Sequence, residues 1–198
     1  MRLSRPFPPL FFSRFPCSTQ TFHLTTYTMA LVNLRPLLPG HVLICSRRCV
    51  PRLCDLTVPE TTDLFLTVQL VTRMLERVYV ADGFNIAIQD GVAAGQSVPH
   101  VHVHAIPRMR GDLGEDEVYE RLQGREGDVG DALRAASGEL EGGYQREGRF
   151  PVPEGERKDR TMEEMEAEAQ MLWREMGREL GELEEGEGAG GGGPEEKL

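Results

Sequence analysis

The chain has 198 residues, a formal net charge of −10 and a mean hydropathy of −0.36, which predicts one domain with extensions or two small domains. No apolar run approaches the roughly 18 to 20 residues that cross a bilayer, so we expect no membrane span. Seven arginines and no acidic residue precede Asp55, whereas residues 181–198 contain six glutamates against one lysine. No basic and aromatic face typical of nucleic-acid binding is evident, so nucleic acid is not an expected partner.

The first residues, MRLSRPFPPLFFSRFP, combine three arginines and two serines with no acidic residue, a composition that fits an organelle targeting peptide. Four prolines oppose the amphipathic helix that such a peptide needs. We therefore expect residues 1–19 to be a disordered or targeting extension of a cytoplasmic protein. The nucleus is the alternative location, and mitochondrial targeting by residues 1–16 is the less favoured interpretation.

A single folded unit is predicted over residues 20–123, and it begins with strands. After TFHLTT (21–26), alternation of side chains predicts a strand over 28–33, and a turn ending at Gly40 leads to a second strand over 41–45. A capping box of Thr57 and Glu60, with Pro59 in the first turn, predicts a helix to about Val78. Its apolar residues recur at helical spacing and form one buried face: Leu64, Val68, Val71, Leu75 and Val78.

A second pair of strands follows the predicted helix. FNIAIQDG alternates from residue 84, which predicts a strand whose polar face ends at Gln89. The loop GVAAGQS then leads directly into PHVHVHAIP at 99–107, so we expect the two strands to be antiparallel neighbours. In that arrangement Gln89, Gln96 and Ser97 would converge on the histidines.

Charged residues and glycine dominate the sequence after Pro107. VYERLQ predicts a short helix, and residues 124–160 lack periodic apolar residues, which predicts a mobile charged loop. A second capping box, Thr161 and Glu164, predicts an amphipathic helix over 161–180 that belongs to the same domain. Residues 181–198 are expected to form a disordered, acidic and glycine-rich tail.

Three histidines stand at every second position, His100, His102 and His104. On a strand they share one face at about 6.6 Å intervals, so the outer two stand roughly 13 Å apart and the three cannot contact one atom equally. The row is open to three interpretations: a nucleophile with two helpers, a zinc site, or a polar strand edge. Zinc lacks a third ligand nearby, because residues 91–111 contain no Asp, Glu or Cys. The nucleophile is the favoured interpretation, with His102 best placed to attack.

An imidazole is well suited to attack phosphorus. Its ordinary pKa near 6.5 leaves one ring nitrogen unprotonated at neutral pH, and attack gives a phosphoramidate that water can hydrolyse. The other ring nitrogen needs an acceptor, which here would be a backbone carbonyl. Gln89, Gln96 and Ser97 can donate to phosphate oxygens without adding negative charge, and His104 could protonate the leaving group.

These residues carry a resemblance to a known family. HVHVHAI, preceded by GQSVP, resembles the histidine triad motif, and MALVNLRPLLPGHVLI with IQDGVAAGQS resembles the fragile histidine triad branch, the dinucleoside polyphosphate hydrolases. The resemblance covers residues 20–123 and returns at TMEEMEAEAQMLW. It implies an α+β fold with an antiparallel sheet and two main helices, a homodimer, and hydrolysis of diadenosine triphosphate to AMP and ADP through an adenylyl-histidine intermediate.

The resemblance also implies roles for individual residues. His102 matches the nucleophile, His104 and His100 match its supporting histidines, and Gln89 completes the catalytic set. The residues that match substrate-binding positions are Gln96 and Ser97 at the phosphates, His41 as an outlying fourth histidine, Asn33 at a ribose, and Leu31 and Leu43 in the adenine pocket. For Asn33 the alternative is a turn-capping role; without the resemblance, the two leucines would be interpreted as plain core. Tyr119 matches a loop tyrosine of the family but is assigned no catalytic role.

Other interpretations remain open at this point. A nucleoside phosphoramidase is the neighbouring enzyme, and a nucleotide-binding signalling module with incidental turnover is the non-enzymatic alternative. The four cysteines lack a CxxC pair and are expected to be reduced thiols. We expect no bound metal and no protein-bound cofactor, although a divalent cation such as Mg²⁺ could accompany the substrate.

Overall fold

A five-stranded antiparallel sheet with strand order β3-β4-β5-β7-β6 forms the centre of the protein in a computed structural model. The structure describes residues 7–114, 117–124, 130, 133–134 and 159–181. The strands are β3 (Thr21–Leu24), β4 (Thr28–Val32), β5 (Val42–Ser46), β6 (Gly83–Ala87) and β7 (His102–Arg108). The predicted α+β class is confirmed, and both predicted antiparallel strand pairs are present.

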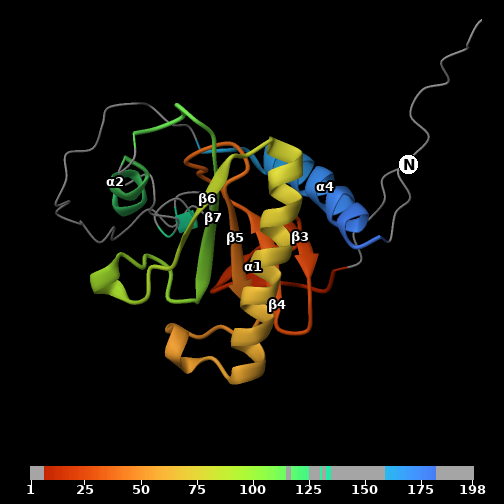
Figure 1. Cartoon of the computed structure of the whole chain (residues 1–198). Helices are drawn as coiled ribbons and strands as arrows, with labels where there is room; N and C mark the ends of the chain where they lie inside the picture. Colours follow the sequence, from red (N-terminus) through yellow and green to blue (C-terminus); the bar gives the residue numbers. More distant parts are fainter. Residues whose placement is uncertain (1–6, 115–116, 125–129, 131–132, 135–158, 182–198) are drawn as a thin grey trace, which may run out of the picture.

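Two helices pack together on one face of the sheet: α1 (Val58–Tyr79) and α4 (Met162–Glu179) (Figure 1). Each begins with the capping box that the sequence predicts, at Thr57 and at Thr161. Between helices and sheet lies a hydrophobic core in which alternate residues of the strands meet the apolar stripes of the helices. A shorter helix, α2 (Glu117–Gln123), packs its Val118 and Leu122 against Ile106 of β7. No helix in the described part of the chain is both long and apolar enough to cross a membrane.

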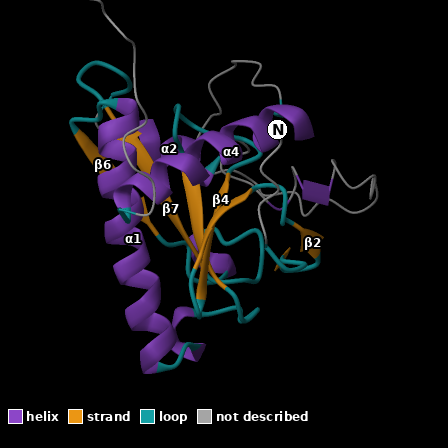
Figure 2. Cartoon of the chain, turned by 90° about the vertical axis from the view of Figure 1, so that its right-hand side faces the viewer, coloured by secondary structure: helices purple, strands orange, loops and turns teal. Residues whose placement is uncertain are grey.

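The opposite face of the sheet is covered by a small hairpin near the start of the chain. Strands β1 (Phe11–Phe12) and β2 (Phe15–Pro16) pair antiparallel, and Figure 2 shows β2 on the side of the sheet away from α1. The prediction that residues 1–19 are disordered is therefore wrong for residues 7–19. The physical reason is long-range packing, because Leu10 and Phe12 are buried in a cluster with residues of β4 and β5.

Most of the predicted loop 124–160 and of the predicted tail 181–198 lies outside the described residues. Gly130 and Leu133 are described, and both approach the sheet on the hairpin side. The histidine strand also differs slightly from the prediction, because β7 begins at His102 and His100 lies just before it.

Candidate active site

The sheet presents the histidine row on the face that the hairpin covers. In β7, Val103 and Ala105 enter the core under the helices, so His102 and His104 lie on the other face by strand alternation. Their partners across the ladder are Cys45 and Leu43 of β5. The ring centroids of His102 and His104 are 5.0 Å apart, so the two imidazoles are direct neighbours.

His100 is tied to the main chain by both ring nitrogens. The Ser13 amide donates to Nδ1 at 2.8 Å, which makes Nδ1 an acceptor and places the imidazole proton on Nε2. That Nε2–H donates to the carbonyl oxygen of Ser46 at 2.6 Å. Burial lowers the pKa of His100, so the neutral form persists. His100 therefore acts as a fixed spacer whose own carbonyl is directed at the next histidine.

His102 has the geometry of a nucleophile. Its Nδ1–H donates to the His100 carbonyl oxygen at 2.7 Å, which leaves the lone pair on Nε2. Within the described residues Nε2 is buried and makes no hydrogen bond. Burial lowers the pKa of His102 to about 4, more than its carbonyl partner raises it. The ring is therefore neutral, with one unengaged basic nitrogen, at neutral pH.

His104 and His41 form a directed pair. The Leu37 amide donates to Nδ1 of His41 at 3.0 Å, so His41 carries its proton on Nε2 and donates it to Nδ1 of His104 at 3.0 Å. His104 must then carry its own proton on Nε2, an atom that is buried and has no hydrogen-bond partner among the described residues. Burial, with His102 and His41 beside it, lowers the pKa of His104 well below 6.5. His104 therefore presents a neutral N–H donor on a ring whose centroid is 5.0 Å from that of His102.

The predicted phosphate ligands Gln96 and Ser97 both form hydrogen bonds with other parts of the chain. Gln96 accepts from the Gly91 amide at 3.1 Å and donates to the Pro51 carbonyl oxygen at 2.7 Å. Ser97 Oγ accepts from the Gly130 amide at 3.1 Å. Because Ser97 Oγ only accepts in this contact, its O–H is left to donate to a phosphate oxygen.

Gln89 lies two residues beyond Ala87, which pairs with His104 across the ladder between β6 and β7. Strand alternation therefore directs Gln89 to the histidine face. Its Nε2 donates to the Leu122 carbonyl oxygen at 3.2 Å, while its Oε1 is buried without a hydrogen-bond partner among the described residues. A buried amide with an unused polar atom is a group that a polar ligand can complete.

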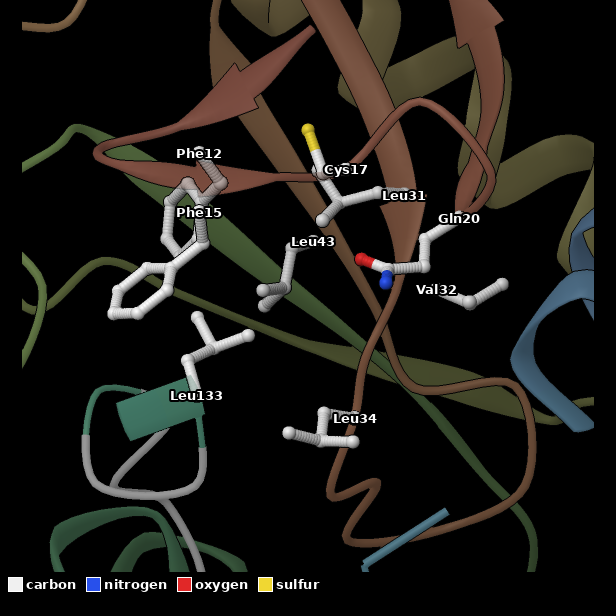
Figure 3. Close-up of a pocket in the computed structure, with 9 residues that line it drawn as sticks. All are labelled: Phe12, Phe15, Cys17, Gln20, Leu31, Val32, Leu34, Leu43 and Leu133. Atoms are coloured by element: carbon white, nitrogen blue, oxygen red, sulfur yellow. The ribbon is translucent and has the colours of Figure 1, made fainter. Parts of the chain in front are cut away.

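A small apolar cavity lies between the hairpin and strands β4 and β5 (Figure 3). It measures about 10 Å³, room for about one water molecule, and is far smaller than a purine ring. The predicted residues Leu31 and Leu43 line it. The other lining residues were not predicted and come from the hairpin and the segment after it, from the end of β4 and just beyond, and from residue 133: Phe12, Phe15, Cys17, Gln20, Val32, Leu34 and Leu133. The only sequence signal for these was the cluster of phenylalanines at 11, 12 and 15 in an otherwise aperiodic stretch.

Phe12 also covers the histidines themselves. Its ring stacks on His100 with centroids 5.3 Å apart and meets His102 edge-on at 5.2 Å. Because Phe12 and both histidines are at most 1% exposed, the nucleophile is shielded from water in this conformation. Substrate entry requires Phe12, Leu133 or both to move.

Asn33 follows β4 and lies beside His41. Its Nδ2 is 3.4 Å from Nε2 of His41 and 3.5 Å from Nδ1. Its Oδ1 accepts from the Arg35 amide at 3.1 Å, the turn that the simpler interpretation predicts. Asn33 thus caps a turn and also lies against the fourth histidine. Within the described residues, no group of three or more His, Cys, Asp or Glu side chains is placed to hold a metal ion.

An antiparallel sheet with His102 and His104 on one face, His100 just before their strand and His41 in series with His104 defines a histidine triad protein. The HIT domain family matches residues 17–111. A bis(5'-nucleosyl)-tetraphosphatase (asymmetrical) of Schizosaccharomyces pombe is 49% identical over 168 residues, which cover 82% of this chain and 92% of that protein. The chain belongs to the HIT domain family.

Two further relatives match a shorter segment. A bifunctional bis(5'-adenosyl)-triphosphatase/adenylylsulfatase of Arabidopsis thaliana is 53% identical over 54% of this chain and 60% of its own length. A bis(5'-adenosyl)-triphosphatase of Saccharomyces cerevisiae is 50% identical over 58% of this chain and 56% of its own length. The chain therefore spans less than two thirds of these two relatives.

Solved structures support the fold. The Caenorhabditis elegans NITFHIT protein is 38% identical with a TM-score of 0.54, over 65% of this chain and 31% of that chain. A Plasmodium falciparum diadenosine triphosphate hydrolase, solved with cyclomarin A, is 24% identical with a TM-score of 0.63 and covers 88% of both chains. The second similarity concerns the fold alone.

Proposed function

We propose that this protein hydrolyses dinucleoside polyphosphates and cleaves diadenosine triphosphate to AMP and ADP through an adenylyl intermediate on His102. The observation that carries the proposal is the tautomer of His102. Its Nδ1–H is fixed on the His100 carbonyl, so the lone pair of Nε2 is free and buried. The names of the relatives that match most of the chain, or a little more than half of it, support the choice of substrate class.

The reaction proceeds in two displacements. Nε2 of His102 attacks the α-phosphorus, an N–P bond forms, and the bond from that phosphorus to the bridging oxygen breaks. ADP leaves with the bonding electron pair on its phosphate oxygen, and His104 Nε2–H donates a hydrogen bond to that oxygen while His41 holds the His104 ring. Water then attacks the same phosphorus and its proton passes to solvent, the N–P bond breaks, and AMP is released with the lone pair restored to His102.

Binding uses the groups around the nucleophile. The Ser97 hydroxyl, which accepts from the Gly130 amide, donates its own proton to a phosphate oxygen, and Gln89 and Gln96 add amide groups that carry no charge to repel the substrate. The adenine enters the cavity between Leu31 and Leu43 once its covers move. We assign the ribose hydroxyls to the amide of Asn33.

Several accompanying proposals complete this picture. The protein acts as a homodimer, supported by the exposed side chain of Ile86 on the edge strand β6, and it works in the cytoplasm. No protein-bound cofactor is required, and Mg²⁺ arrives with the polyphosphate. Light scattering of the purified chain measures the oligomeric state.

Hydrolysis of diadenosine triphosphate in ¹⁸O-labelled water tests the reaction, with diadenosine tetraphosphate run in parallel. The label should appear on AMP, because water attacks the phosphorus held by His102; label on ADP would overturn the proposal. His102→Asn should reduce kcat by about 10⁴-fold or more while nucleotide binding persists. His23→Asn, the same change on β3, is the matched control and should keep full activity. A cellular effect that survives His102→Asn would favour a signalling module instead.

A further inference from the structure

Arg160 lies immediately before α4 and grips the end of β4. Its Nε donates to the backbone carbonyl oxygen of Asn33 at 3.1 Å, and Nη2 donates to the same oxygen. Its own amide donates to the carbonyl oxygen of Leu34 at 3.1 Å. The guanidinium is therefore directed at the main chain of the residue whose side chain lies beside His41.

The other end of the guanidinium is anchored on the two helices. Nη1 of Arg160 pairs with Glu168 of α4, and Oε1 of Glu168 accepts from the hydroxyl of Tyr79 at 2.8 Å. Burial and the nearby Glu168 carboxylate raise the pKa of Tyr79, so its hydroxyl keeps the proton it donates. The chain of contacts joins the last turn of α1, the first half of α4 and the end of β4.

The ring of Tyr79 lies close to the backbone just before His41, the residue that the Asn33 side chain approaches. Gly40, with φ of +77°, precedes His41, and a Cβ at this glycine would lie 2.7 Å from the Tyr79 ring. The ring therefore fixes how closely the turn before His41 approaches the helix. Arg160 thus holds the backbone of Asn33, and Tyr79 holds the backbone just before His41. The side chains of Asn33 and His41 approach each other to 3.4 Å, between Nδ2 and Nε2.

We infer that Arg160 is a positioning residue for nucleoside binding: it holds the Asn33 side chain in place against the ribose without touching the substrate. The inference rests on the ribose role proposed for Asn33. A planar fork of donors is needed, because two nitrogens serve one carbonyl while the third pairs with Glu168. Lysine has one nitrogen and cannot make both contacts in that geometry.

Arg160→Lys tests the inference by its dependence on ribose hydroxyls. We expect the Kd for AMP to rise about tenfold, the scale of one lost hydrogen bond to a charged group, while the Kd for 2',3'-dideoxy-AMP changes less than about twofold. For diadenosine triphosphate, KM should rise by a similar factor with kcat nearly unchanged. In an Asn33→Ala background the substitution should have almost no further effect, because both changes act on one contact.

Asp159→Asn is the matched control. Asp159 pairs with Arg35 and joins the same two segments, with an Nη2–Oδ2 distance of 2.9 Å, but within the described residues its side chain forms no hydrogen bond with Asn33. This variant should bind both nucleotides as the wild type does. Urea unfolding of each variant separates loss of stability from loss of positioning.

Three results would overturn the inference: an equal loss of AMP and dideoxy-AMP binding in Arg160→Lys, full additivity with Asn33→Ala, or a lowered urea midpoint with unchanged Kd. A wild type that binds the two nucleotides equally would remove the ribose role of Asn33 and the inference with it. Failure of hydrolysis alone would refute the proposed reaction and leave the binding comparison informative.

Discussion

The pH dependence of hydrolysis tests the buried state of His102 directly. The nucleophile must be unprotonated, and burial lowers its pKa to about 4. The active form therefore predominates above pH 4, and activity should fall only as the pH drops through that value. A solvent-exposed histidine with the ordinary pKa near 6.5 would lose activity two and a half pH units earlier.

The difference is large enough to measure at pH 5.5. An imidazole with a pKa of 6.5 is about 9% unprotonated there, whereas one with a pKa of about 4 is about 97% unprotonated. The two cases differ by about tenfold in kcat/KM, which reports on the free enzyme. The lowered pKa values of His100 and His104 act in the same direction, because both rings stay neutral in the fold.

Initial rates of AMP release, measured below KM at constant ionic strength from pH 5 to pH 8, give the profile. The histidines are protonated first in the unfolded chain, so the free energy of unfolding also falls as the pH drops below about 6.5. Far-UV circular dichroism at each pH therefore checks that the protein is folded. An acid limb centred near pH 6.5 in folded protein would refute a buried, neutral His102.

Three further substitutions give expected outcomes. Gly40→Ala places a Cβ 2.7 Å from the Tyr79 ring at a positive φ, and should lower the free energy of unfolding by about 1–3 kcal/mol and reduce activity, measured by urea unfolding and rates. Glu60→Ala removes the capping box of α1 and should cost about 1 kcal/mol at pH 7; because the Glu60 pKa is lowered to about 2, that cost should shrink as the pH falls from 4.5 toward 2. Gly130→Ala would place a Cβ 2.5 Å from the Ser97 carbonyl oxygen, so this residue should withdraw and Ser97 Oγ should lose the amide that orients its hydroxyl; the KM for diadenosine triphosphate should rise a few-fold, and an unchanged KM would show that the contact does not assist binding.

Local signals in the sequence were sufficient for the frame of the site. The capping box at Thr57 placed the start of α1, and its end at Tyr79 lies one residue from the prediction. Alternation in HVHVHAI placed His102 and His104 on one face because Val103 needs the other for the core. Such signals work because helix caps and strand periodicity depend on neighbours within a few residues.

Contacts between distant residues were not predictable in this way. The Ser13 amide bonds a histidine 87 positions later, and Phe12 stacks on that same ring, although neither lies in a periodic stretch. Gln96 was assigned to a phosphate, yet its amide holds the Pro51 and Gly91 backbone. Which groups a side chain finds in the folded state depends on packing between segments, which periodicity does not encode.

The hydrogen bonds that orient the imidazoles explain why the site needs no carboxylate. The Ser13 amide, the Ser46 carbonyl, the His100 carbonyl and the Leu37 amide, all main-chain groups, fix the tautomers of the nucleophile and its neighbours. Every residue supplies main-chain groups, whatever its side chain. Residues 91–111 can therefore lack Asp and Glu and still fix the tautomer that leaves a basic nitrogen on His102. The same main chain forms the ladder between β5 and β7, and a one-residue slip in that ladder would turn the imidazoles into the helix-facing core. The strand register that stabilises the sheet is therefore also what keeps the nucleophile basic and correctly directed.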